Sequence, residues 1–511
     1  MNMKKHYVYI LIMILLLSAS CSEFEKMNTN PDNTTQVTPG LIATGQLVDM
    51  MWKGSAKNYF YDTFVSKQFA MGEQQESYQY NRFGRTGFGT YQKLTNCLKM
   101  VEAADGAAKE GYAALAKFMI AYQLYDITLS VGDIPYSDAF QGEGGVVKPK
   151  YDTQKDVMIQ ILDDLEEAYT GFSNAAIPLD GDIIFDGDYS KWKKTVTAMQ
   201  LKVLISLSKK ESDTDLNIRQ RFSDIVAARP LMASNSDNFQ LVYGNESSKI
   251  CPLHRTKNSH TPYAMITSVV VDTLKKYNDY RLFYFGKPSP VKIKEGYTAS
   301  DWEAYPGTDP AASFSDVKEL YSLTDYTFIN NRYTEIETGE PLVRLGYAQQ
   351  NFILAEACLR GWITGDANDY YLKGIRASME FILENTPDSE DYHHGRQMTD
   401  GYIEAYLANP DIQLAGTPGT FERDLNKIIT QKYLSAFIQY PWESYYEYRR
   451  TGYPVLPINP NTNLNRPADK MPMRWMYEQR ELDFNRDNVE EAIQRQYNGN
   501  DDVNELMWIL K

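Results

Sequence analysis

The feature that most constrains the fold is a set of long segments whose apolar residues recur at helical spacing. In residues 111–131 these are Leu115, Phe118, Met119, Tyr122 and Tyr125, with small Ala114 and Ala121 beside them. Spacings of three and four residues place such side chains on one face of an α-helix, which must then be buried. The same spacing recurs in 153–171, 190–209, 262–277 and 345–385. We therefore expect a mostly α-helical protein.

The segment 345–385 is predicted to be a pair of helices. The first ends near Gly361, and a second amphipathic run containing Tyr371 and Ile375 follows after a short turn. Such a pair is the building block of TPR-like arrays. Because no clean repeat of about 34 residues runs through the chain, any array is degenerate. A length of 511 residues alone suggests about three domains, but one continuous helical scaffold with long loop insertions explains it better.

Four segments lack this periodicity and are predicted to be long loops: 72–91, 286–333, 386–420 and 453–474. Loops of this length within a compact domain are usually functional or disordered. A last helix is predicted to begin near Asn488, which can cap it while Glu491 completes a capping box.

Composition excludes several classes of protein. Hydrophobic residues make up 43% of the chain, enough for a substantial core, so disorder is excluded. A net charge of −15 argues against nucleic-acid binding. The mean hydropathy of −0.47 excludes a polytopic membrane protein.

The first residues are typical of an export signal. Lys4 and Lys5 precede an apolar run, Val8–Leu17, which is too short for the roughly 20 residues that span a bilayer. Small residues then lead to Cys21, and this pattern resembles a bacterial lipobox, in which the cysteine is diacylated. We expect a signal peptide at 1–20 and a lipidated flexible tether at 21–40; the alternative is an ordinary secretory signal.

The other cysteines and the histidines suggest no metal site. Cys97, Cys251 and Cys358 are widely spaced and odd in number, so neither a disulfide framework nor a zinc pattern is expected. Cys97 and Cys358 lie in helical patterns and are predicted to be small buried residues. His254, His260 and the pair His393 and His394 lack the HExxH spacing and are predicted to lie at the surface or at helix ends.

An acidic stretch leaves one cofactor question open. Asp180, Asp182, Asp186 and Asp188 bring four carboxylates into a turn-rich segment. Calcium needs six to eight oxygen ligands, and the ligand order of an EF-hand is missing. A solvated turn is the favoured interpretation, and calcium is the alternative. We otherwise expect no cofactor and no metal.

No enzyme motif is present. The chain has no nucleophile elbow, no P-loop and no dinucleotide-binding glycine pattern. Spacing alone leaves a glycoside hydrolase open, because its paired carboxylates converge only in the fold. We expect a protein that is not an enzyme.

Five ordered motifs carry a resemblance to a known family. They are Met27–Asn33 with Val37–Pro39, Gly132–Ala139, Gly187–Trp192, Tyr347–Leu359 with Gly374–Ser378, and Ile428–Tyr433 with Glu447–Pro454. With these motifs the chain resembles the SusD/RagB family, surface lipoproteins of Bacteroidetes nutrient importers, in its RagB-like version. The resemblance covers almost the whole mature chain.

The resemblance implies a SusD-like helical fold with TPR-like pairs, forming a single ligand-binding domain over residues 41–511. It also implies a protein anchored by lipid in the outer membrane and facing the cell exterior. There it would act as the lid of a SusC-like TonB-dependent barrel and deliver an oligosaccharide or a peptide to it. The alternative is a TPR-like assembly scaffold that binds no nutrient.

Two loops carry the predicted ligand-binding residues. Sugar rings stack on aromatic side chains, while amides and charged groups bind the hydroxyls. The first loop supplies Tyr78, Tyr80, Arg82 and Phe83, and the loop 286–313 supplies Tyr297, Trp302 and Tyr305.

Two motifs receive a structural interpretation instead. Gly132–Ala139 is predicted to end a helix through a glycine with positive φ. Arg449 and Arg450 could bind a carboxylate or a sugar, but pairing with the surplus of acids is the favoured role.

Overall fold

The computed structural model describes residues 37–417, 419–439 and 441–511. The predicted signal peptide, the predicted lipidation at Cys21 and most of the predicted tether lie outside the described residues. The last two tether residues, Pro39 and Gly40, belong to helix α2 (Pro39–Met51). The Thr38 hydroxyl caps this helix by accepting a hydrogen bond of 3.3 Å from the Leu41 N–H.

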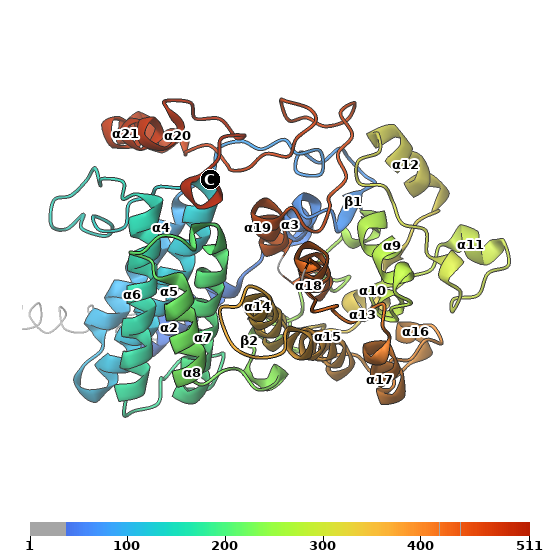
Figure 1. Cartoon of the computed structure of the whole chain (residues 1–511), viewed down its shortest axis with the longest axis horizontal. Helices are drawn as coiled ribbons and strands as arrows, with labels where there is room; N and C mark the ends of the chain where they lie inside the picture. Colours follow the sequence, from blue (N-terminus) through green and yellow to red (C-terminus); the bar gives the residue numbers. More distant parts are fainter. Residues whose placement is uncertain (1–36, 418, 440) are drawn as a thin grey trace, which may run out of the picture.

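The first half of the chain forms a layer of helices that lie side by side (Figure 1). They are α2, α4 (Gly89–Ala103), α5 (Lys109–Val131), α6 (Gln154–Asn174), α7 (Tyr189–Ser206) and α8 (Ile218–Ala228). Helix α5 is buried on most of its faces, because α4, α6 and α7 pack around it. The predictions for 111–131, 153–171 and 190–209 are confirmed.

The predicted helix pair is also confirmed and lies at the centre of the molecule (Figure 1). It consists of α14 (Tyr347–Leu359) and α15 (Ala367–Glu384), and it packs against α18 (Phe421–Ser435), which in turn contacts α19 (Pro441–Thr451). The two helices approach closely at Gly374, where an added Cβ would lie 2.7 Å from the Phe352 ring. A mostly α-helical fold with helix pairs is therefore present.

Small sheets and short helices form the remaining part. One sheet has the antiparallel order β1-β3-β5-β4, with strands β1 (Phe69–Met71), β3 (Ala264–Ile266), β5 (Phe328–Ile329) and β4 (Gly286–Lys287). A second sheet pairs β2 (Phe239–Leu241) with β6 (Leu342–Leu345). The short helices are α3 (Tyr61–Val65), α9 (Ser268–Lys276), α10 (Arg281–Phe285), α11 (Pro290–Lys294), α12 (Phe314–Leu323), α13 (Asn331–Thr334), α16 (Glu390–His393), α17 (Asp400–Ala408), α20 (Gln479–Phe484) and α21 (Arg486–Tyr497).

Three predictions on secondary structure need correction. Only 268–276 of the predicted helix 262–277 is α-helical, since Ala264–Ile266 is the buried strand β3 between β1 and β5. The predicted loops 286–333 and 386–420 contain short helices and two strand segments. The last helix begins at Arg486, and Asn488 donates a hydrogen bond to the Lys148 carbonyl (3.1 Å) instead of capping it.

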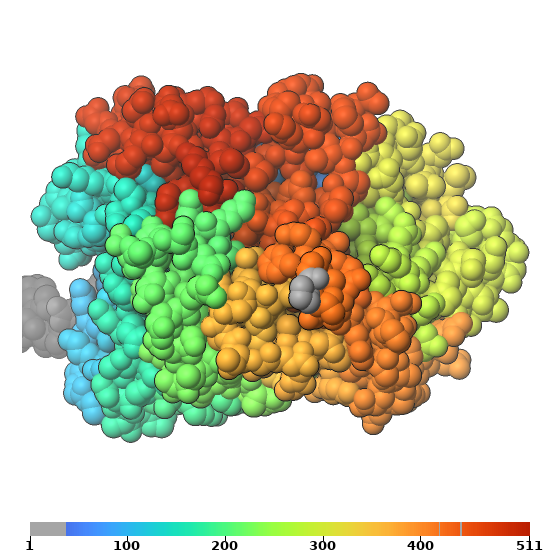
Figure 2. Space-filling view, viewed as in Figure 1, coloured from blue at the N-terminus to red at the C-terminus, as the bar shows by residue number. Residues whose placement is uncertain are grey.

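The segment that follows α19, residues 452–511, lies against both the N-terminal layer of helices and the region near residue 320. In the space-filling view its red and orange surface runs along one edge, beside the green N-terminal helices and the yellow region near residue 320 (Figure 2). No helix within the described ranges is long and apolar enough to span a membrane.

The turn after α5 shows how this segment is attached. Gly132 has φ 96°, and an added Cβ would lie 2.0 Å from Gln496 Oε1 of α21. The next carboxylate, Asp133, is 1% exposed and accepts hydrogen bonds from Gln154 N–H (2.8 Å) and from Arg495 Nη2 (2.6 Å). The structural role predicted for Gly132–Ala139 is confirmed.

Candidate functional site

A cleft with an empty volume of about 1070 Å³ lies between the first helical layer and α19. Five aromatic side chains from four separate parts of the chain line it: Tyr78, Tyr122, Trp442, Tyr446 and Trp475. We call this hollow the aromatic cleft. Three of these rings, Tyr78, Trp442 and Tyr446, are partly exposed.

Tyr78 is the centre of the ring arrangement. Its ring centroid lies 5.8 Å from that of Trp442, with an angle of 89° between the ring planes, and 6.4 Å from that of Trp475. The indole N–H of Trp475 donates a hydrogen bond of 3.2 Å to the Tyr78 hydroxyl. Behind them Phe83 stacks on Trp475 at 4.5 Å. Because Tyr78 and Trp442 remain partly exposed, their rings can contact a ligand in the cleft.

Polar contacts hold the loop that carries Tyr78. The Gln79 amide accepts a hydrogen bond from the Met71 N–H (3.0 Å) and donates one to the Pro310 carbonyl (3.4 Å). The Leu464 N–H donates to the Tyr80 carbonyl at 2.8 Å. Three segments that are distant in sequence therefore interlock beside the cleft.

The backbone next to Trp475 is fixed in the same way. Trp475 N–H donates to the Ser130 carbonyl at the end of α5 (2.9 Å), and Met476 N–H donates to the Gly84 carbonyl (3.0 Å). Trp442 lies in the first turn of α19. The rings are thus presented by a rigid helix and by two loops that are tied to each other.

Charged groups of both signs line the floor of the cleft. Asp62, Asp126 and Glu443 contribute carboxylates, and Lys202 and Arg344 contribute cations. Burial raises the pKa of Asp126, although Lys202 and Arg344 partly oppose that effect. Burial also disfavours ionisation of Glu443, but the neighbouring ammonium groups, Lys202 at 2.9 Å among them, outweigh it and lower the pKa to about 2. Such a mixed floor can exchange hydrogen bonds with a neutral ligand rich in hydroxyl groups.

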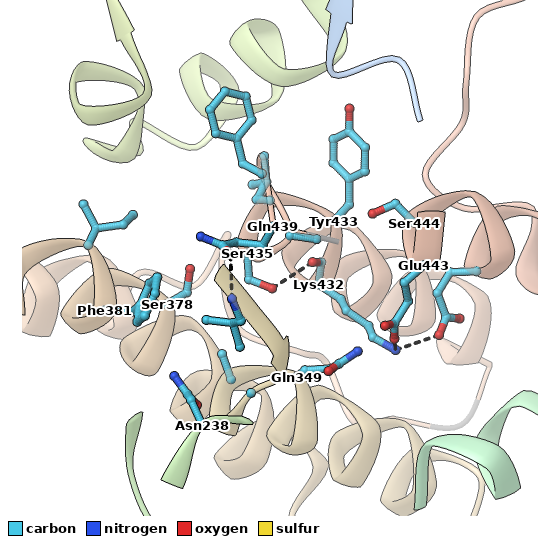
Figure 3. Close-up of a pocket in the computed structure, with 18 of the residues that line it drawn as sticks. Asn238, Gln349, Ser378, Phe381, Lys432, Tyr433, Ser435, Gln439, Glu443 and Ser444 are labelled. Atoms are coloured by element: carbon cyan, nitrogen blue, oxygen red, sulfur yellow. Dashed lines mark hydrogen bonds and ion pairs between the residues drawn. The ribbon is translucent and has the colours of Figure 1, made fainter. Parts of the chain in front are cut away.

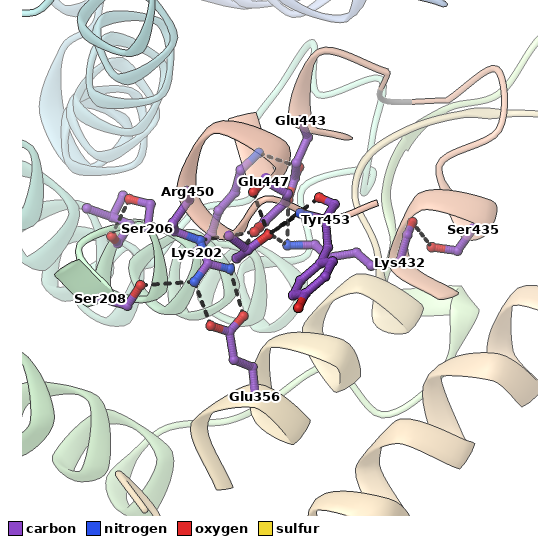
Figure 4. Close-up of polar contacts among 12 residues, drawn as sticks. Lys202, Ser206, Ser208, Glu356, Lys432, Ser435, Glu443, Glu447, Arg450 and Tyr453 are labelled. Carbon is purple, nitrogen blue, oxygen red and sulfur yellow. Dashed lines mark hydrogen bonds and ion pairs between the residues drawn. The ribbon is translucent and has the colours of Figure 1, made fainter. Parts of the chain in front are cut away.

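A row of buried ions continues from this floor into the protein (Figure 4). Charges of opposite sign alternate along it in the order Lys202, Glu443, Lys432, Glu447, Arg450 and Glu356. Arg450 contacts Glu356 at 2.5 Å, and Lys432 contacts Glu447 at 2.7 Å. These pairs join α7, α14, α18 and α19. Removing one member would leave a buried charge without its partner, which is strongly destabilising.

The two arginines predicted to be structural have that role. Arg450 pairs with acids, as expected. Arg449 instead donates to the Met473 and Leu129 carbonyls, both at 2.7 Å. It thereby attaches the segment leading to Trp475 to helix α5.

A second pocket, with an empty volume of about 780 Å³, lies on the other side of Glu443 (Figure 3). Side chains of α14, α15 and α18 surround it, among them Gln349, Phe381 and Ser435. Several of its polar groups serve the fold: Ser435 donates to the Lys432 carbonyl (2.8 Å), and the Gln439 amide accepts from Val343 N–H (2.9 Å). The aromatic cleft is the stronger candidate, because three of its five rings, Tyr78, Trp442 and Tyr446, are partly exposed, whereas Phe381 alone is so among the four aromatic rings that line this pocket.

Of the four ligand-binding residues predicted on the first loop, one lines the aromatic cleft, Tyr78. Tyr80 is 2% exposed and donates its hydroxyl to the Ala312 carbonyl (3.1 Å), and Phe83 is 8% exposed. Arg82 is exposed but does not line the cleft. The expectation of open rings is therefore wrong for Tyr80 and Phe83, because the interlocking loops bury them.

The second predicted loop does not reach the aromatic cleft. Tyr305 is fully buried, and its hydroxyl donates to the Ala299 carbonyl (2.7 Å), so it is not an open ring. Trp302 packs on Phe283 with 4.7 Å between centroids and stays partly exposed. Tyr297 is 40% exposed. A role of Trp302 or Tyr297 in binding stays a prediction.

Sequence reasoning missed Trp442, Tyr446 and Trp475. Residues 442–448 contain four aromatic residues, and this run was a usable signal for the first two. Trp475 follows the proline-rich segment and has no such local signal. It enters the cleft only because residues 475–476 pair with backbone near Gly84 and Ser130.

The acidic stretch is a solvated turn at three of its four carboxylates, since Asp180, Asp186 and Asp188 are exposed, as the favoured interpretation expects, but Asp182 is buried. Asp182 is 6% exposed, and its carboxylate accepts four N–H groups, including the Trp192 indole at 2.7 Å. These donors engage both oxygens of the Asp182 carboxylate, and the alternative of calcium at this stretch stays a hypothesis. In the described part of the chain no cluster of three or more metal-ligating side chains is found.

Of the cysteines, Cys97 is buried as predicted, whereas Cys358 is only partly buried. His254 is buried and lies outside any helix, so the prediction is wrong for it, whereas His393, although buried, lies at the end of α16, which is one of the two predicted locations.

Comparisons with known proteins agree with this architecture. A SusD-like family model, described as starch-binding associating with outer membrane, matches residues 31–478. A solved SusD homologue from Bacteroides fragilis NCTC 9343 is 52% identical, with a TM-score of 0.90, and the match covers 93% of this chain and 100% of that chain. Another from the same organism is 35% identical, with a TM-score of 0.82 and the same coverage of 93% and 100%.

More distant matches concern the fold alone. A chitin-binding SusD homologue from Flavobacterium johnsoniae is 18% identical, with a TM-score of 0.71, and the match covers 93% of this chain and 98% of that chain. A comparison with curated proteins finds no match.

Proposed function

The chain belongs to the SusD/RagB family, and on that premise we propose that it is a binding protein that captures an oligosaccharide in the aromatic cleft. The observation that carries the proposal is the group of Tyr78, Trp442 and Trp475 above a floor of mixed charge. The C–H faces of sugar rings stack on such side chains, and hydroxyl groups bind carboxylates and cations. The family description, starch-binding associating with outer membrane, supports the same class of ligand.

We further propose that the protein acts at the cell surface. Cys21 would carry the lipid anchor in the outer membrane, and a SusC-like TonB-dependent barrel would receive the ligand, with this protein as its lid. The apolar run and small residues before Cys21 and the outer-membrane association of the family support this arrangement. Two acyl chains give stable anchoring, whereas one is marginal.

Ligand binding is tested by calorimetry on the mature chain carrying Cys21→Ala. Maltoheptaose and chitohexaose serve as sugar probes, and a peptide mixture serves as competitor. We expect Tyr78→Ala to weaken binding of the active probe at least tenfold, since it removes the central ring. Phe484→Ala is the matched control, because this ring is 70% exposed and outside the cleft.

If wild type and Tyr78→Ala bind the sugar probe with equal affinity, the aromatic cleft is not the binding site. Displacement of the sugar by peptides would indicate a peptide ligand instead. Shortened sugars in the sample, absent with Asp126→Asn, would indicate a glycoside hydrolase.

The anchor and the partner need tests in cells. Cys21→Ala is expected to release the protein from the membrane fraction, and retention there would contradict lipidation. Purification of the tagged wild type is expected to recover a β-barrel transporter. Recovery of other proteins without any bound sugar would favour the alternative of an assembly scaffold.

A further inference from the structure

Lys67 is a buried lysine between α3 and β1, directly below the loop that carries Tyr78. It is 1% exposed and has φ 59°, a left-handed conformation that is unfavourable for a residue with a side chain. A long charged residue in a strained and buried position requires an explanation. Neither packing nor the backbone favours lysine there.

Oxygen atoms of the loop surround its ammonium group. Nζ lies 2.5 Å from the Gln79 carbonyl, 2.7 Å from Asn81 Oδ1 and 3.5 Å from the Tyr78 carbonyl. An ammonium has three N–H donors, which matches three acceptors. Burial lowers the pKa of Lys67 to about 7. Hydrogen bonds to the three oxygens favour the charged form.

No carboxylate within the described residues pairs with Lys67. The charged groups on the neighbouring elements contact other partners: Glu76 contacts Lys57 at 3.1 Å, and Asp62 of α3 contacts Lys53 at 3.4 Å. From the β3 side, Thr267 donates its hydroxyl to the Lys67 carbonyl. The ammonium therefore acts on the loop alone.

The orientation of Asn81 transmits this contact to a second loop. Because Lys67 can only donate, Asn81 must turn Oδ1 toward it, and its Nδ2 then donates to Asn463 Oδ1 (3.3 Å). Asn463 in turn donates through Nδ2 to the Ala468 carbonyl (2.7 Å) and the Lys470 carbonyl (2.8 Å). Each amide in the series has its donor and acceptor ends fixed by the group before it.

We propose that Lys67 is the positioning residue of the aromatic cleft, whose ammonium fixes, through Asn81 and Asn463, the two loops that carry Tyr78 and Trp475. The importance of this role for ligand binding rests on the proposed function. The effect on the loops does not, so it can be tested without any ligand.

The test is hydrogen–deuterium exchange of the mature Cys21→Ala chain and its variants. In Lys67→Met we expect amides in both 76–83 and 459–470 to exchange at least tenfold faster, because the donor at the start of the series is lost. Exchange within α5 is expected to stay unchanged, which a general loss of stability would not permit. Lys67→Arg keeps a charged donor and is expected to restore part of the protection.

Two further variants separate the steps. Asn81→Asp keeps an acceptor for Lys67 but presents an oxygen to Asn463 Oδ1, so only 459–470 is expected to exchange faster. Lys287→Met is the matched control, since this lysine donates to an amide oxygen of Asn331 (2.8 Å) and does not line the cleft.

Unchanged exchange in both loops of Lys67→Met would overturn the proposal. If that variant does not fold, unchanged exchange at 459–470 in Asn81→Asp would overturn it. If both loops of Lys67→Met exchange faster but this variant binds the sugar as tightly as wild type does, the role of Lys67 in holding the loops stands. The proposed binding site is then contradicted.

Discussion

The two loops predicted to bind ligand both carry aromatic rings but are built in different ways. The loop 72–88 is held by polar contacts, those of Lys67 below it and of its own Gln79 and Asn81, and this leaves Tyr78 at the edge of a cavity. The loop 286–313 is held by its own rings, because Tyr305 and Trp302 pack on Phe283. An aromatic residue that anchors its loop has little surface left for a ligand. Polar anchors are what leave a ring available for binding.

The largest expected effect concerns an anchoring ring. Tyr305→Ala removes a fully buried ring and a hydroxyl that donates to the Ala299 carbonyl. We expect the free energy of unfolding to fall by about 4 kcal/mol, as for other large-to-small core substitutions. Denaturant unfolding followed by circular dichroism measures it. A loss below about 1 kcal/mol, which is typical of surface positions, would show that rings do not hold this loop.

A polar anchor should respond to pH, whereas a ring should not. Burial raises the pKa of Asp133, in the turn after α5, to about 6, although Arg495 and the Gln154 N–H partly oppose it. The folded state therefore binds this proton more tightly than the unfolded state. The resulting stabilisation is complete below pH 4 and is lost as pH rises through 6.

Lowering the pH from 7 to 4 should therefore stabilise wild type relative to Asp133→Asn by up to about 3 kcal/mol. Urea unfolding of both proteins at four pH values checks this difference. If the free energies of unfolding of the two proteins change with pH in parallel, the prediction is contradicted. Tyr305→Ala, compared with wild type over the same range, should show a constant difference.

The ring with free surface should matter for affinity more than for stability. Trp442→Ala removes a partly exposed wall of the aromatic cleft, and we expect a 10- to 100-fold loss of affinity for the active sugar probe, about 1.4–2.7 kcal/mol. Titration calorimetry measures it. Full affinity in a folded Trp442→Ala protein would remove this residue from the site.

The smallest effect is expected for the partly exposed ring of the other loop. Trp302→Ala should lower the free energy of unfolding by about 1–2 kcal/mol, since only part of its surface is buried. Affinity for the same sugar probe should stay within twofold of wild type. A tenfold loss would show instead that the loop 286–313 contributes a second contact for the ligand.

The helical scaffold could be predicted because its pattern is local. Helices α5, α6 and α14 repeat apolar residues over three or more turns, and such a signal does not depend on the rest of the chain. The strands have two to four residues and are buried by their neighbours. Their sequences therefore lack the alternation of apolar and polar residues that indicates a β-strand. Helices such as α11 and α16 were missed because they too are short.

The site was predictable only in part, since it is made by contacts between distant segments. Tyr78 was found because aromatic and amide residues are adjacent in its loop. Tyr80 has the same neighbours in sequence, yet Ala312 and Leu464 cover it. Nothing near Trp475 in sequence indicates that it faces Tyr78.

The hydrogen bond between Trp475 and Tyr78 joins residues 397 positions apart. A chain still in synthesis, or cut anywhere before residue 475, holds Tyr78 without the partner that completes the cleft. On the proposed function, capture of a ligand therefore requires a folded chain that extends at least to residue 475.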